Sequence, residues 1–177
     1  MKYTSDVIEK DALLTVANLM ATAARTAPKA RGVDTILTLV VDGEEKDALA
    51  AEMRKIAEGG EKYVNFARDA KNLDASAFVV LLAVIDQPLN LALCSVCGFE
   101  NCAAATAAGS PCAFNLSDLG TAASSACIVA ANHWVDNRLM YTAGRAAMHL
   151  DFFGEKVRHC YGIPISASGK SPYFDRK

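Results

Sequence analysis

Most of the chain shows apolar residues at helical spacing, separated by short polar or glycine-containing turns. In the segment 5–25, apolar side chains follow the helical period behind an acidic first turn, which is typical of an amphipathic helix. The segment 115–134 is rich in alanine, and such small side chains indicate that this helix packs closely against another element. The segments predicted to be helical are residues 5–25, 44–59, 62–72, 103–108, 115–134 and 142–153.

Three short segments have the β-branched or continuously apolar composition of strands. The run FVVLLAVI (78–85) is apolar at every position, as expected for a central strand that helices cover on both faces. TILTLVV (35–41) and VRHCYGIPI (157–165) are the other two predicted strands, and the tail that follows is predicted to be a loop. Three strands among several helices predict an α/β or α+β sandwich, and we expect residues 1–177 to form a single domain.

The composition narrows the classes of function. The chain has 177 residues, of which 52% are hydrophobic and 21% charged, and its formal net charge is -2. Because nucleic-acid-binding domains carry a basic face, this charge argues against nucleic acid as a partner. No apolar run reaches the roughly 18–20 residues of a membrane helix. The start MKYTSDVIEKDALL lacks the positive and then apolar pattern of a signal peptide. We therefore expect a cytoplasmic protein without membrane association, in a compartment where thiols stay reduced.

The most informative motif is the run CSVCGFENCAAATAAGSPC, which lies in a cysteine-rich segment over residues 90–114. Its spacing is C-x2-C-x4-C-x9-C, and its cysteines are Cys94, Cys97, Cys102 and Cys112. Four thiols in one short irregular loop suit a [4Fe–4S] cluster, and Gly98 and Gly109 permit the tight turns that wrapping a cluster needs. Zinc and buried or redox-active thiols are the alternatives, although a zinc ribbon usually has two C-x2-C pairs.

The other two cysteines have a different setting. Cys127 lies in the predicted alanine-rich helix and Cys160 in a predicted strand. Free cysteine is among the most buried residue types, so we expect both thiols to pack in the core and to take no part in metal binding.

A second candidate site is basic. Arg25, Lys29 and Arg31 lie beside Pro28, and they either anchor a phosphate or another anion or belong to a solvated loop. Lys170, in Gly-Lys-Ser, is a further candidate for contact with a phosphate, although the glycine pattern of a P-loop is absent. The sequence shows no Ser-His-Asp arrangement and no paired-carboxylate motif, so we do not expect hydrolase chemistry.

The cysteine motif also carries a family resemblance. CGFENC, PCAFNLSDLG (111–120) and the tail GIPISASGKSPYFDR (162–176) resemble a family of bacterial and archaeal proteins described only as containing a ferredoxin domain. The run from Cys94 to Cys102 is similar to the C-x2-C-G-x3-C pattern of small four-iron domains in anaerobic electron-transfer and corrinoid proteins. The resemblance implies a [4Fe–4S] cluster and leaves the activity open.

The scaffold resembles a second family, the flavin nitroreductases. The segments 20–49, 124–134 and 161–164 look like the A-P-S-x-x-N segment, a later helix and a late strand ending G-x-P in those enzymes. The resemblance implies an α+β homodimer that binds FMN at the subunit interface, with the cysteine loop beside the flavin. The chain departs from the pattern, because it lacks the initial Arg-Arg-Ser and has Lys29 and Gly32 in place of the serine and asparagine.

These observations support two hypotheses of function. The first is an iron–sulfur electron-transfer protein that exchanges electrons with a redox partner protein or a small-molecule acceptor; if FMN binds as well, it is a flavin-dependent oxidoreductase. The second is a non-enzymatic binding or sensing module, in which zinc or an iron–sulfur cluster holds the cysteine loop rigid.

Overall fold

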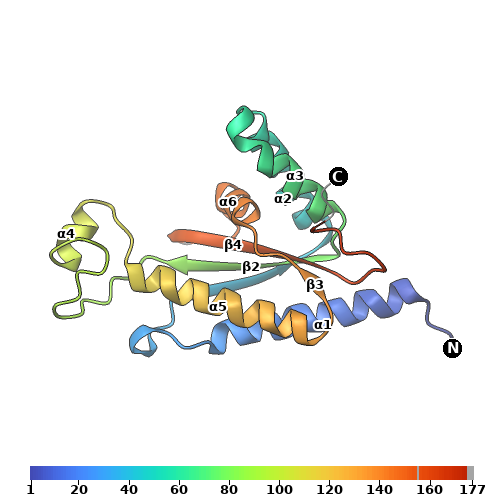
Figure 1. Cartoon of the computed structure of the whole chain (residues 1–177), viewed down its shortest axis with the longest axis horizontal. Helices are drawn as coiled ribbons and strands as arrows, with labels where there is room; N and C mark the ends of the chain where they lie inside the picture. Colours follow the sequence, from blue (N-terminus) through green and yellow to red (C-terminus); the bar gives the residue numbers. More distant parts are fainter. Residues whose placement is uncertain (155, 175–177) are drawn as a thin grey trace.

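The computed structural model describes residues 1–154 and 156–174 (Figure 1). The predicted helices are present, with boundaries that differ by a few residues from those expected. The α-helices are α1 (Ser5–Thr26), α2 (Gly43–Ala57), α3 (Val64–Asp74), α4 (Cys102–Ala107), α5 (Ala113–Asn132) and α6 (Tyr141–His149). Short 3-10 helices are η1 (Ala30–Gly32) and η2 (Glu61–Tyr63). The strands are β1 (Ile36–Val41), β2 (Phe78–Ile85), β3 (Asp136–Asn137) and β4 (Val157–Ser166).

The four strands form one antiparallel sheet in the order β1-β2-β4-β3. The three predicted strands are confirmed, and β2 is the central strand that its apolar sequence predicts. The two-residue strand β3 was not predicted, because a strand of this length has no periodic pattern. Since every pairing is antiparallel, the fold is α+β rather than α/β.

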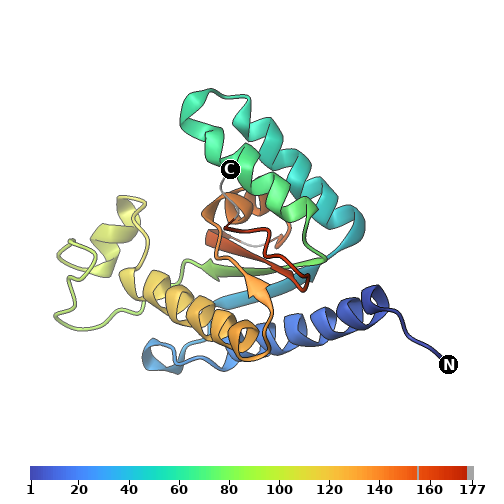
Figure 2. The ribbon, with the colours of Figure 1, turned by 45° about the vertical axis from the view of Figure 1, so that its right-hand side comes forward.

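Helices cover both faces of the sheet (Figures 1 and 2). Helices α1 and α5 lie on one face, and α2, α3 and α6 lie on the other. The alternation of strand β2 explains this arrangement, because successive side chains point to opposite faces. Its even-numbered positions join the core beneath α1 and α5, while Val79, Leu81 and Ala83 join the core beneath the other three helices.

Small side chains set the close packing of both layers. On one face, fully buried alanines of α5, such as Ala122 and Ala126, meet α1, which confirms the close packing predicted for the alanine-rich helix. On the other face, Gly144 of α6 packs directly on the backbone of β4. A Cβ atom at Gly144 would lie 1.8 Å from the carbonyl oxygen of Cys160.

One predicted boundary is corrected. Helix α6 ends at His149 instead of residue 153, because Asp151 has a φ of 52°, which ends the helical path. The aromatic pair Phe152 and Phe153, which suggested a longer helix, instead packs against the core as part of a turn. In the tail, Tyr173 is buried, although residues 167–174 have the irregular structure that was predicted; the last three residues of the predicted loop, 175–177, lie outside the described residues.

In residues 1–154 and 156–174, no helix has the length and apolar character required to cross a membrane.

Candidate functional site

The four motif cysteines lie in a long connection between β2 and α5, which projects from the end of the sheet opposite the N-terminus (Figures 1 and 2). We call residues 86–112 the cysteine loop. Side chains from distant points of this loop line one common pocket whose exposed lining is entirely apolar. The pocket is lined by Pro88, Cys94, Cys97, Cys102, Ala105, Ser110, Cys112, Ala113 and Phe114. The structure thus brings together the four thiols that the spacing predicted as ligands.

The backbone of the cysteine loop turns sharply where the thiols converge. Gly98 and Gly109 have positive φ values of 85° and 68°, so the two glycines occupy conformations that side chains disfavour, as the sequence predicted. Asn90, Leu93 and Ser95 also have positive φ, which is uncommon outside glycine. Such strained residues persist where the surroundings or a ligand fix the chain, and they cluster at functional sites.

Polar contacts anchor the cysteine loop to the sheet at both of its ends. At the end of β2, Asp86 accepts a hydrogen bond of 3.3 Å from the backbone N–H of Cys112. Arg158, at the start of β4, donates to the carbonyl of Gly109, and its Nε lies 4.0 Å from Asp86 Oδ2. The backbone N–H of Gln87 donates to Asn115 Oδ1 at 3.0 Å. The bond between Cys112 and Asp86 thus joins the two ends of the loop, and Arg158 of β4 and Asn115 of α5 hold these ends in place.

The residues of the pocket fit a thiolate-bound metal centre in their chemistry. Cys112 is the N-cap of the 20-residue helix α5, so it lies at the positive end of a helix dipole, which suits an anionic metal centre. Three residues later, Asn115 is buried, and its Nδ2 has no hydrogen-bond partner in the described part of the chain. A buried donor of this kind suits an anionic acceptor.

The dimensions of the pocket are less favourable for a large cluster. The space between the lining side chains is about 20 Å³, room for roughly one water-sized sphere. Among the described residues, no three side chains of His, Cys, Asp or Glu have the arrangement of a complete metal site. The loop would therefore need to expand to take a multi-iron cluster, whereas a single ion needs a smaller adjustment.

The remaining two cysteines have the core environment that was predicted. Cys160 is fully buried among the side chains beneath α6, and burial raises the pKa of its thiol to about 12. Cys127 is partly buried against the core beneath α1 and α5, and burial raises the pKa of this thiol as well. Both thiols therefore stay protonated at neutral pH and are poor metal ligands.

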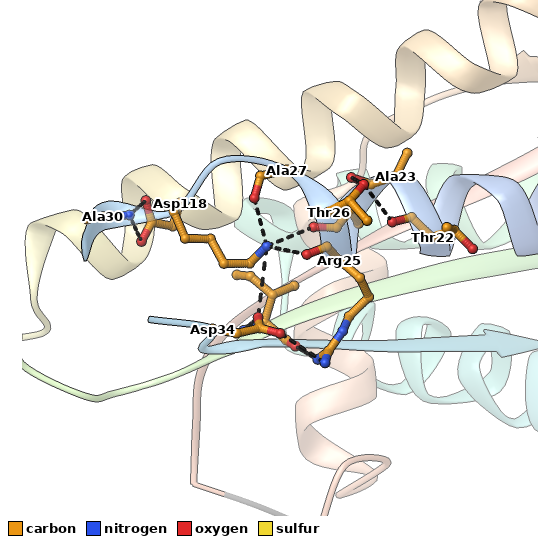
Figure 3. A network of polar contacts seen from close by, with 11 residues as sticks. Thr22, Ala23, Arg25, Thr26, Ala27, Ala30, Asp34 and Asp118 are labelled. Atoms are coloured by element: carbon orange, nitrogen blue, oxygen red, sulfur yellow. Dashed lines mark hydrogen bonds and ion pairs between the residues drawn. The ribbon is translucent and has the colours of Figure 1, made fainter. Parts of the chain in front are cut away.

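The basic patch beside Pro28 is engaged in contacts within the chain (Figure 3). The ammonium of Lys29 lies within 2.6 Å of the carbonyl oxygen of Arg25 and 2.9 Å of that of Ala27, at the C-terminal end of α1. Its side chain is only 5% exposed, and Asp34 Oδ1 lies 3.9 Å from the ammonium. Lys29 thus satisfies carbonyl groups that the end of a helix leaves without partners.

The neighbouring arginines also bind parts of this chain. Arg25 forms an ion pair of 2.9 Å with Asp34 and donates to the carbonyl of Ile36 at 2.7 Å. Arg31 has a φ of 58° and donates to the carbonyl of Leu89 at 3.0 Å, which ties this turn to the cysteine loop. Arg25 and Arg31 remain largely exposed, so they are accessible to an anion despite these contacts.

Lys170 lies apart from those three residues, beside α3 on the other face of the sheet. It lines a hollow of about 630 Å³ together with Arg68 and Lys71 of α3 and with Ser171 and Pro172 of the tail. We call this the basic hollow. The sequence reasoning missed Arg68 and Lys71, although their spacing of three residues on a predicted helix places both on one side of it.

Comparison with known proteins identifies relatives of the chain. Residues 108–176 match the family described as "Uncharacterized protein containing a ferredoxin domain (DUF2148)". A protein of Archaeoglobus fulgidus, described as uncharacterized, is 43% identical over 166 residues, which are 89% of this chain and 88% of the relative.

Solved structures share the fold at low sequence identity. A nitroreductase with bound FMN from Desulfitobacterium hafniense superimposes with a TM-score of 0.61 at 16% identity, covering 96% of this chain and 81% of the other. A nitroreductase family protein from Clostridium novyi gives a TM-score of 0.59 at 15% identity, covering 97% of this chain and 80% of the other. These likenesses confirm the predicted nitroreductase-like fold, and at such identities they carry no more than the fold.

Proposed function

Since the chain belongs to the family of proteins that contain a ferredoxin domain, we propose that it is an iron–sulfur electron-transfer protein. The observation that carries the proposal is the convergence of Cys94, Cys97, Cys102 and Cys112 on one apolar pocket. A bound [4Fe–4S] cluster accepts and releases single electrons, which none of the side chains of this site does reversibly. The electrons would pass to a redox partner protein or a small-molecule acceptor.

The residues around the pocket have distinct roles in this proposal. The four thiolates are the ligands, and the apolar lining from Pro88, Ala105 and Phe114 keeps water away from them. Asp86 and Arg158 fix the position of Cys112 and of the turn at Gly109 relative to the sheet. Asn115 provides a buried amide N–H group beside the pocket, and such donors stabilise negative charge on sulfur.

We propose the basic hollow as the place for an FMN cofactor. This position differs from the subunit interface that the nitroreductase resemblance implies, because the exposed apolar side chains that suit a dimer lie on α1 and α5, on the other face of the sheet. Arg68, Lys71 and Lys170 offer positive charge to its phosphate, in a space of about 630 Å³. Arg25 and Arg31 remain candidates for contact with an anion on the face of the sheet that carries α1. The buried ammonium of Lys29, in contrast, already donates to carbonyl groups at the end of α1. With FMN bound, the protein would be a flavin-dependent oxidoreductase that links one-electron and two-electron chemistry.

We further propose a homodimer in the cytoplasm. Helix α1 carries exposed apolar side chains, including Val7, Ile8 and Leu14, and α5 carries Ile128. Clustered apolar exposure of this kind marks interaction surfaces, and a second copy of the chain is the partner that the nitroreductase-like fold favours. Reduced thiols, which the metal site requires, are typical of the cytoplasm.

One observation favours the second hypothesis, a binding or sensing module with a structural zinc ion. The pocket of about 20 Å³ accommodates a single ion with less movement of the loop than a cluster requires. Zinc accepts four cysteine thiolates in a closed tetrahedral site and stabilises the fold around it.

Anaerobic purification of the full chain, followed by assays of iron, sulfide, zinc and flavin on the same sample, tests these alternatives. The proposal predicts about four irons per chain with absorbance that bleaches on reduction. Colourless protein with about one zinc per chain would support the structural site, because zinc has no redox chemistry. Release of FMN would extend the proposal to a flavoenzyme.

Matched cysteine variants locate the metal. Cys97→Ser should abolish iron binding and leave the circular dichroism of the helices and sheet unchanged, because Cys97 lies outside both hydrophobic cores. Cys127→Ser, the control, should keep the iron content of the parent protein. Full iron in Cys97→Ser, or iron loss in Cys127→Ser, would show that the assignment of ligands is wrong.

A further inference from the structure

A second large hollow lies on the face of the molecule that carries α2, α3 and α6. It has a volume of about 560 Å³ and opens between the end of α2, the start of α3 and one side of α6. We call it the aromatic hollow. Its lining residues are Ile56, Lys62, Tyr63, Asn65, Phe66, Tyr141, Thr142, Arg145 and His149. None of these residues takes part in the cysteine pocket or the basic hollow.

Aromatic rings form a continuous wall of this hollow. Tyr63 and Phe66 meet edge to face with ring centroids 6.1 Å apart, and Phe66 meets Tyr141 in the same manner at 6.4 Å. Tyr141 stacks on His159 at 5.8 Å with an interplanar angle of 29°. The contacts with Phe66 and His159 fix the orientation of the Tyr141 ring, although Tyr141 itself is 53% exposed. A preorganised and accessible ring of this kind is a suitable surface for a planar ligand.

The charges in the hollow are positive. Lys62 lies 4.8 Å from the centre of the Tyr63 ring, and Arg145 donates to the sulfur of Met148 at 3.9 Å. Within residues 1–154 and 156–174, neither of these cations has a carboxylate partner. Two positive groups that face a hollow without a counter-ion favour an anionic ligand.

Two carboxylates that contact lining residues of the hollow already have partners. Asp69 accepts a hydrogen bond of 2.7 Å from Thr142 and forms an ion pair of 2.8 Å with Arg68. Glu52 lies 3.3 Å from the His149 ring nitrogen and 3.6 Å from the ammonium of Lys55. These acidic groups are therefore engaged elsewhere than with Arg145 or Lys62, and among the residues that the structure describes no Asp or Glu lines the hollow.

We propose that the aromatic hollow binds a small planar aromatic carboxylate. The ring of the ligand lies against Tyr141 and Tyr63, where aromatic contacts take an offset or edge-to-face geometry. The guanidinium of Arg145 donates two parallel hydrogen bonds to the carboxylate, as in a bidentate arginine–carboxylate pair. Lys62 adds a second positive charge at the exposed rim. The exposed amide of Asn65 is a further donor.

Calorimetric titration of the purified full chain tests this proposal with three probes. Benzoate has both an aromatic ring and a negative charge. Cyclohexanecarboxylate keeps the charge without the aromatic ring, and benzyl alcohol keeps the ring without the charge. We expect benzoate to bind about tenfold or more tightly than either of the others, as expected when one aromatic or one charged contact is lost. Equal affinity for benzoate and cyclohexanecarboxylate, or no binding of benzoate, would overturn the proposal.

Variants then place the probe in the hollow. Arg145→Gln should weaken benzoate binding by about tenfold or more, because a hydrogen-bonded charge pair is lost. Lys10→Gln, which removes an exposed cation from α1 on the opposite face of the sheet, is the matched control and should bind benzoate as the parent does. If Arg145→Gln does not fold, Lys62→Gln at an exposed position serves the same purpose, with a smaller expected loss. Unchanged benzoate affinity in the folded charge variant would overturn the proposal.

Discussion

Strand β2 and the cysteine loop that follows it are adjacent in sequence and are stabilised in different ways. In β2, every residue from Phe78 to Val84 is buried between two layers of helices, and both of its edges are paired with other strands. In the loop, Leu93 and Val96 are exposed, and three residues other than glycine adopt positive φ. Hydrophobic burial accounts for the strand, because it is the dominant favourable contribution to folding.

Burial does not account for the conformation of the loop. A hydrogen bond between Cys112 and Asp86 joins the two ends of the loop, and Asn115 and Arg158 bind these ends to α5 and β4. The turn from Asn90 to Gly98, in contrast, has few buried side chains. A segment without an apolar core needs another source of order, and a shared metal centre supplies folding free energy directly. The difference teaches that the metal centre proposed for the four cysteines would stabilise the loop in addition to transferring electrons.

The largest expected effect on stability is at Gly144 of α6, where this helix packs on strand β4 of the sheet. Gly144→Ala would place a methyl group 1.8 Å from the Cys160 carbonyl oxygen, so α6 must move away from β4. We expect a loss of more than about 3 kcal/mol in the free energy of unfolding, measured by urea denaturation. Iron content per soluble chain should fall with the folded fraction, because the sheet supports the loop.

Gly120→Ala is the matched control for that substitution. Gly120 also lies in a helix, α5, and a Cβ atom there would have no neighbour within 4 Å. Alanine should stabilise the helix by about 0.5–1 kcal/mol through its higher helix propensity. A comparable loss of stability in both variants would contradict the steric explanation.

A smaller effect is expected from pH, through the buried thiol of Cys160. Burial raises the pKa of this thiol from 9.0 to about 12, so the folded chain keeps the proton in a range where the unfolded chain releases it. The free energy of unfolding should therefore fall as pH rises from about 9 towards 12, with a contribution of up to about 1.4 kcal/mol per pH unit from this group.

Comparison with Cys160→Ala isolates this contribution. The stability advantage of the parent over the variant should shrink as urea denaturation is repeated at increasing pH between 8 and about 11. A difference that stays constant across this range would mean that the thiol ionises equally in both states. The same change should leave iron content unaltered, which separates core cysteines from loop cysteines.

The smallest effect is expected within the loop at Leu93. Its side chain is fully exposed, so Leu93→Ser removes no buried contact and should change the free energy of unfolding by less than about 0.5 kcal/mol. Because the φ of Leu93 is 56°, Leu93→Gly should be tolerated equally well or better. A loss above about 1 kcal/mol in either variant would show that the loop packs more closely than its exposure indicates.

Much of the fold was predictable because its signals are local. The apolar run of β2 and the helical periods of α1 and α5 each occupy one continuous segment, and each appears where it was predicted. The two-residue strand β3 has no such signal, since its pairing with β4 depends on the fold around it. The end of α6 was missed for a similar reason, because Phe152 and Phe153 are apolar but pack from a turn.

The candidate site was predictable only where its residues are close in sequence. The four cysteines occur within one short run, so their convergence followed from spacing. Lys29 was predicted as an anion contact from its charge, but sequence alone does not show that three carbonyl oxygens at the end of α1 approach its ammonium. Arg68 and Lys170 line the same hollow but are about a hundred residues apart in the sequence, and strands β2, β3 and β4 lie between them along the chain.

The alanines between α1 and α5 have a consequence for studies of evolution in this family. Ala122, Ala126 and Ala130 of α5 and Ala17 and Ala24 of α1 have no exposed surface, and the two helices meet across them. A larger residue at these positions would force the helices apart, so selection for volume alone would keep them unchanged. In an alignment they would be as invariant as ligands, and their constancy would record the distance between two helices rather than any chemistry.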